Sequence, residues 1–146
     1  MEKSQAQLRK NSSLSDQAVS GLFGGLLGGL AMALVIALFS LSYGQGLAFL
    51  GYFSTETAAA PLQGVLMHLA VAGVYGMLYQ LLRHWLGLGR LKIPGVLVGL
   101  VYGVLLWAVA VTVLLPAARS IMLSIAWPAF FFGHVAYGLV LGWRQA

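Results

Sequence analysis

Charged side chains are scarce in this sequence of 146 residues. Eight Lys and Arg and three Asp and Glu make up 8% of the chain, whereas an ordinary soluble domain carries about 25%. They leave charge-free stretches at 17–55, 57–82, 93–118 and 120–143. Each stretch exceeds the roughly 18 apolar residues that mark a candidate membrane span. The composition therefore excludes an ordinary water-soluble domain and predicts an all-α integral membrane protein with four transmembrane helices.

Cysteine is absent altogether. Its absence excludes disulfides, thiolate metal sites, iron–sulfur clusters and cysteine nucleophiles. No Asp or Glu falls inside an expected span, and Glu56 lies between the first two spans. A carboxylate relay for protons or sodium ions is therefore not expected. The sequence also contains no phosphate-binding loop, dinucleotide fingerprint, His-Glu-x-x-His motif or Gly-x-Ser-x-Gly motif. We expect neither enzyme activity nor a metal site.

The basic residues flank the expected spans unevenly. A net charge of +5 would suggest nucleic acid as the partner of a soluble protein. Here the positive charge comes mostly from Lys and Arg that flank membrane spans, so no nucleic-acid partner is expected. Arg119 stands alone between the third and fourth spans, and the others fall in the two tails and the central connection: Lys3, Arg9, Lys10, Arg83, Arg90, Lys92 and Arg144. Because basic segments resist translocation, both termini are predicted to be cytoplasmic, in the inner (plasma) membrane.

These boundaries predict a polar cytoplasmic tail at 1–17 and a single four-helix transmembrane domain at 18–146. The expected spans cover about 18–42, 61–82, 94–115 and 120–143. Ser12, Ser13, Ser15 and Asp16 offer helix N-caps. Pro61 and Pro94 suit the starts of the second and third spans, and Pro116 suits the exit of the third. Pro128 falls inside the fourth span and predicts a kink.

Small residues recur at a spacing of four in every expected span. In lipid, helices associate by van der Waals contact, and glycine allows their backbones to approach closely. We therefore expect most of these residues to pack helix against helix within the chain: Gly21, Gly25, Gly29, Gly64, Ala72, Gly76, Gly95, Gly99, Gly103, Gly138 and Gly142. The first and third spans each carry three glycines at spacing four, whereas the second and fourth carry His-x3-small-x3-Gly. This alternation predicts two pseudo-repeated helical hairpins.

His68 and His134 are the only ionisable residues inside the spans other than tyrosines. Such residues mark candidate functional sites by default. They are candidate ligands of a haem or a (bacterio)chlorophyll, although no cofactor is expected from the sequence as a whole. Counting to the nearest cytoplasmic charges sets the two about 7.5 Å apart in depth, a strained arrangement for one shared metal. The alternatives are hydrogen bonds between helices and a pathway for a substrate or proton.

Several motifs resemble a known family. Gly99-x3-Gly103-x3-Trp107, which runs on to Pro116, is similar to the YqhR-type conserved membrane proteins of bacteria. Gly21-x2-Gly24-Gly25 and Tyr137-Gly138-x3-Gly142-Trp143 are similar too. The resemblance extends over all four spans in order. It implies a four-helix membrane architecture and no particular activity. The family pattern does not require histidine at positions 68 and 134, so the resemblance implies no role for them.

The sequence therefore suggests a non-catalytic structural or accessory subunit of a larger membrane complex. The expected partners are membrane lipid together with other membrane subunits or a second copy of the chain. Two alternatives remain open, namely a pigment- or haem-binding subunit that uses the two intramembrane histidines and a small transporter or channel. Both alternatives depend on what His68 and His134 face.

Overall fold

The computed structural model describes residues 13–44, 46, 50, 52, 61–90 and 93–144. This part of the chain is helical and contains no strand, which confirms the predicted all-α class. The long helices are α2 (Leu14–Ser42), α3 (Pro61–Trp85), α4 (Gly95–Val109) and α6 (Trp127–Trp143). A π-helical segment, η3 (Ala110–Leu114), and a last turn, α5 (Leu115–Ala117), extend α4, while η2 (Leu88–Arg90) and η4 (Ile121–Ser124) are short 3-10 helices.

Three of these helical segments are long and apolar enough to cross a membrane. They are Leu14–Ser42, Pro61–Trp85 and the continuous segment Gly95–Ala117. The fourth helix, α6, is shorter, with 17 residues. The chain therefore has the composition and helix lengths of a membrane-embedded protein.

The start of α2 is fixed by reciprocal hydrogen bonds. The hydroxyl of Ser13 accepts from the Asp16 backbone N–H at 3.2 Å, and the Asp16 carboxylate accepts from the Ser13 N–H at 2.9 Å. This capping box satisfies backbone donors that the first helical turn otherwise leaves unpaired. It also places a negative charge at the positive end of the helix dipole. As a result, α2 begins at Leu14, within the predicted tail.

The predicted kink at Pro128 is wrong. Pro128 is the second residue of α6, which begins at Trp127 after η4 and a bend. A proline costs little in the first helical turn because the N–H that it lacks would have no partner within the helix. The continuous helix expected over 120–143 is therefore replaced by a 3-10 turn, a bend and a shorter α6.

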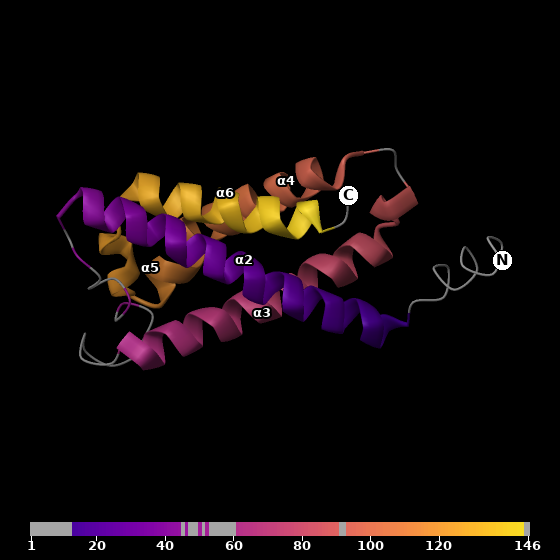
Figure 1. Ribbon diagram of the computed structural model, residues 1–146, viewed down its shortest axis with the longest axis horizontal. Helices are drawn as coiled ribbons and strands as arrows, with labels where there is room; N and C mark the ends of the chain where they lie inside the picture. Colours follow the sequence, from indigo (N-terminus) through magenta and orange to yellow (C-terminus); the bar gives the residue numbers. More distant parts are fainter. Residues whose placement is uncertain are drawn as a thin grey trace.

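The long helices run alternately in opposite directions (Figure 1). The start of α2, the connection between α3 and α4, and the end of α6 lie at the same end of the bundle. Helix α2 packs against both α3 and α6, and α6 also packs against α4. Few contacts join α3 to α4. The bundle therefore has three closely packed helix pairs and one loose side, between α3 and α4.

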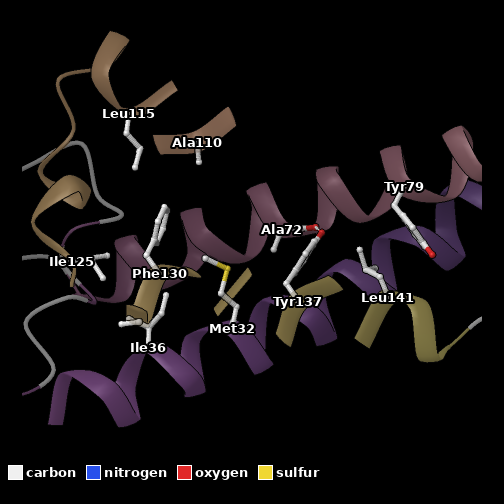
Figure 2. Close-up of a cluster of buried hydrophobic side chains, with 11 residues drawn as sticks. Met32, Ile36, Ala72, Tyr79, Ala110, Leu115, Ile125, Phe130, Tyr137 and Leu141 are labelled. Atoms are coloured by element: carbon white, nitrogen blue, oxygen red, sulfur yellow. Dashed lines mark hydrogen bonds between the residues drawn. The ribbon is translucent and has the colours of Figure 1, made fainter. Parts of the chain in front are cut away.

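Large apolar side chains point outward on every long helix. Leu34 is 61% exposed, Leu62 74%, Val101 59% and Trp127 71%. The interior is instead rich in glycine and alanine, with a limited set of larger side chains such as Ile36, Phe130 and Leu141, shown in Figure 2. A surface of this kind is stable where lipid rather than water surrounds the helices.

Candidate functional site

The α2–α3 interface is built from the predicted small residues. A Cβ atom added to Gly21 would lie 2.7 Å from the Cα of Met77, and one added to Gly25 would lie 2.9 Å from the Cα of Gly73. Both positions thus lie against the backbone of α3, where any side chain would force the helices apart. This close approach gives the two helices the van der Waals contact on which association in lipid depends.

The α4–α6 interface has the same construction. A Cβ atom added to Gly99 would lie 2.7 Å from the backbone nitrogen of Gly142, and one added to Gly142 would lie 2.7 Å from the Cα of Val96. Gly103 faces the backbone of His134 and Gly138. Gly95 contacts Gly142 through its carbonyl oxygen. The glycines at spacing four therefore line the interface of this hairpin from the Gly95–Gly142 contact to the Gly103–His134 contact.

The two hairpins meet along α2 and α6. Gly28 faces the Tyr137 ring, whose Cδ2 atom would lie 2.8 Å from an added Cβ, and Gly24 faces the Leu141 side chain. Of the remaining predicted packing residues, Gly29, Ala72, Gly76 and Gly138 all contact the opposite helix of their own hairpin. Gly64 is buried near the start of α3. The small residues are thus used largely within the chain itself.

A cavity of about 230 Å³ lies on the loose side of the bundle. Its wall is formed by α2, α3, the α4–η3–α5 segment, η4 and α6, and it is mostly apolar. The lining includes Met67 and Val71 of α3 and Leu114 of η3, which are 42%, 48% and 44% exposed at the surface. The cavity therefore opens sideways, between α3 and η3, toward the medium around the bundle.

Both predicted histidines line this cavity. His68 and His134 are each 8% exposed. The Nε2 of His68 lies 3.0 Å from the carbonyl oxygen of Gly29, across the α2–α3 interface. The Nδ1 of His134 lies 2.9 Å from the carbonyl oxygen of Phe130 in its own helix. The difference in depth inferred from the sequence thus does not keep the two side chains out of one cavity.

The chemistry of these bonds assigns the ring protons. A carbonyl oxygen only accepts hydrogen bonds, so Nε2 of His68 and Nδ1 of His134 must each carry a hydrogen. In a neutral imidazole the other nitrogen then has a lone pair, and for His134 this is Nε2, at the tip of the ring. The Phe130 ring packs edge-on against the His134 ring with centroids 4.6 Å apart. The orientation of His134 is therefore set by a hydrogen bond and by packing.

Two tyrosines connect the second hairpin to α3. The Tyr137 hydroxyl donates to the Ala72 carbonyl oxygen at 2.7 Å, as Figure 2 shows, and the Tyr102 hydroxyl donates to the Tyr75 carbonyl oxygen at 2.7 Å. Ala72, Tyr75 and Tyr137 also line the cavity. These bonds hold α3 in place on the side where it has few contacts with α4.

Some of the cavity wall has no signal in the sequence. Met32, Met67 and Met122 resemble other apolar residues of the spans, and Ala110 and Leu114 belong to a π-helical segment that no motif announces. Segments of this type occur frequently at functional sites. Within the described part of the chain, no group of three or more His, Cys, Asp or Glu side chains could hold a metal ion.

Three buried polar atoms, in the part of the chain that the structure describes, have no hydrogen-bond partner: the Tyr79 hydroxyl, Nη1 of Arg83 and Nε1 of Trp107. None of these side chains lines the cavity. The Trp107 ring is held edge-on by Phe131, with centroids 5.0 Å apart. These atoms therefore lie outside the candidate site.

Comparison of the chain with protein-family models, curated proteins and solved structures finds no match. The interpretation of the site therefore rests on its geometry and chemistry.

Proposed function

We propose that this chain is a four-span membrane protein, with both termini cytoplasmic, that binds a small lipophilic molecule in its lateral cavity. The observation that carries the proposal is the cavity itself: about 230 Å³ of mostly apolar space with two histidines in its wall. Binding sites for small molecules commonly combine an apolar wall with a few polar groups that fix orientation. We propose no catalytic step.

The size of the cavity limits what it can enclose. An apolar cavity of about 150 Å³ holds benzene. In proportion, about 230 Å³ encloses a molecule, or part of one, with roughly nine non-hydrogen atoms. A tetrapyrrole joins four pyrrole rings and is larger than this. The volume therefore favours a single ring or a short branched group over the haem or chlorophyll considered from the sequence.

The packing of the glycines also changes the balance between the functions considered. An accessory subunit was suggested partly by the large amount of glycine-lined surface. In the structure this surface lies between helices of the same chain, so it is not available to another subunit. The outward surface carries large apolar side chains, and lipid is sufficient to cover them without another subunit. A binding function in the cavity is thus better supported than an accessory one.

The four-span topology requires α6 to cross the membrane. With 17 residues, α6 is about 26 Å long, at the short end of the range for transmembrane helices. Arg83 and Arg144 lie near the end of the bundle where α2 starts, whereas Arg119 lies beyond the other end of the helices. This separation of charge supports a cytoplasmic location for both termini.

The absence of cysteine makes the topology directly testable with single cysteines and a membrane-impermeant maleimide. Gly89 has open space around its Cα, and Ile121 is 55% exposed. In intact cells, Ile121→Cys should react and Gly89→Cys should react only after the membrane is permeabilised. Reaction of Gly89→Cys from outside would refute the proposed orientation, and reaction of both from one side would refute the third span. Trp143, the last residue of α6, is 73% exposed, and Trp143→Cys should react only after permeabilisation; its reaction from outside together with Ile121→Cys would refute the fourth span.

The binding function can be tested with phenyl azide, a photoreactive ring compound of suitable size. In the purified protein in lipid nanodiscs, mass spectrometry should locate saturable labelling at the wall of the cavity, at Met67 or Met122. Ala110→Phe should abolish this labelling, because Ala110 is buried in the wall. Ala70→Phe adds the same ring on an exposed face of α3 and should leave it unchanged. Labelling spread over the outer surface, or unaffected by Ala110→Phe, would refute the proposal.

A further inference from the structure

We infer that the natural ligand carries a neutral hydroxyl group on its apolar ring or branched head, and that this hydroxyl donates a hydrogen bond to Nε2 of His134. The inference deepens the proposed function and rests on it. Its basis is the polarity of the cavity wall: His134 lines the cavity, and its Nδ1 hydrogen is already donated to the Phe130 carbonyl oxygen.

The lone pair on Nε2 of His134 needs a donor. In the described part of the chain no residue donates a hydrogen bond to this nitrogen. The Tyr137 hydroxyl lies in the same wall, but its hydrogen is donated to the Ala72 carbonyl oxygen. An acceptor left without a donor in an apolar cavity costs free energy. A ligand that brings a donor removes this cost, whereas one with acceptors alone does not.

The donor must also be uncharged. Among the described residues of the cavity wall there is no Asp or Glu to pair with an ammonium group. An unpaired charge in such surroundings is far more costly than a neutral polar group. A hydroxyl meets both conditions.

The lateral opening lets a longer molecule bind with only its head enclosed. The exposed side chains of Met67, Val71 and Leu114 border this opening. A chain attached to the hydroxylated head would leave the cavity between α3 and η3 and lie among lipid acyl chains. The same chemistry therefore fits the head of a hydroxylated membrane lipid and a free phenol-like molecule.

Two isomers test the inference, 4-ethylphenol and 4-methylanisole, which have the same atoms but differ in having a hydroxyl or a methyl ether. Each is used to compete with phenyl azide labelling in nanodiscs. In the wild-type protein we expect 4-ethylphenol to compete at about tenfold lower concentration, the effect of one hydrogen bond in an apolar site. In His134→Leu the ratio of the two competing concentrations should fall to near one. Each compound partitions equally into the lipid around either protein, so the change in this ratio between wild type and variant is independent of partitioning.

Two further variants control this experiment. His84→Leu removes an exposed histidine outside the cavity and should retain the tenfold ratio. His134→Gln keeps an acceptor in its amide oxygen and should retain a preference for the phenol, which keeps the test decisive if His134→Leu does not fold. A wild-type ratio near one, with both compounds competing, would overturn the inference and leave the binding function standing. If the labelling is not saturable and neither compound reduces it, the binding function itself is refuted.

A long-chain phenol separates the two sources of the ligand. If 4-dodecylphenol competes at least as well as 4-ethylphenol, the site accepts the head of a lipid whose tail leaves through the lateral opening. If only the short compound competes, the site takes a free small phenol. Either result supports the assigned hydroxyl, provided that the wild-type preference over the ether is present.

Discussion

In both hairpins, three glycines at spacing four face a stripe of histidine, a small residue and glycine, yet the two histidines are used differently. His68 donates across the helix interface to the carbonyl oxygen of Gly29, and so joins α2 to α3. His134 donates within its own helix to the carbonyl oxygen of Phe130. Equivalent positions in two similar hairpins therefore give one histidine that fastens helices together and one whose lone pair remains available to the cavity.

The comparison teaches that spacing along a helix fixes which residues share an interface, but not how a polar side chain there is bonded. The glycine contacts of the two hairpins correspond closely, because backbone against backbone leaves little freedom. A histidine ring can turn about two bonds, so its partner depends on the neighbours it meets. In α6 the neighbour is Phe130, one turn earlier, and its ring packs against His134.

The largest expected effect comes from adding a methyl group at equivalent glycines of the α2–α3 and α4–α6 interfaces, which tests whether the two interfaces are alike. Gly25→Ala and Gly99→Ala each place a Cβ against the backbone of the opposite helix. Overpacking of this kind costs about 1–3 kcal/mol and sometimes more, so both variants should lose at least about 2 kcal/mol of stability. Thermal unfolding in mild detergent measures the loss, with Gly89→Ala as a control because no atom lies within 4 Å of its added Cβ. A loss in one hairpin only would show that the two interfaces are not equivalent.

A smaller effect distinguishes the histidines. Removing the hydrogen bond between helices in His68→Leu should cost about 1 kcal/mol. His134→Leu should cost less than His68→Leu, since its bond to Phe130 joins residues of one helix and does not hold two helices together. The same unfolding measurement compares them, and His84→Leu, at an exposed position, serves as the control. Equal losses for His68→Leu and His134→Leu would contradict the division of roles.

Much of the fold is predictable because charge and proline limit where helices can lie in such an apolar sequence. Ser13 and Asp16 set the start of α2 through a local capping box, and Pro61 begins α3. The kink predicted at Pro128 was wrong because a proline either kinks a helix or begins one, depending on whether the preceding residues are helical. The sequence alone does not reveal that residues 120–126 form a 3-10 turn and a bend instead of extending α6.

The candidate site is less predictable than the fold. His68 and His134 stand out because they are ionisable residues in apolar spans. The cavity between them depends on the separation of α3 from η3, which follows from the packing of every other helix pair. In the sequence nothing distinguishes Met67, Met122 and Ala110 from other apolar residues. They line the cavity only because α3 and η3 are separated. The polarity of the wall likewise depends on hydrogen bonds that only the folded chain defines.

The unequal lengths of α2 and α6 have a consequence for the surrounding bilayer. The two helices pack side by side, but α2 has 29 residues and α6 has 17, so they measure about 44 Å and 26 Å. Hydrocarbon about 30 Å thick fits neither length. In the proposed topology, α2 tilts or extends into the headgroup region, and lipids beside α6 are compressed. The protein would thus favour thin membranes and would thin a thicker one locally on a single side.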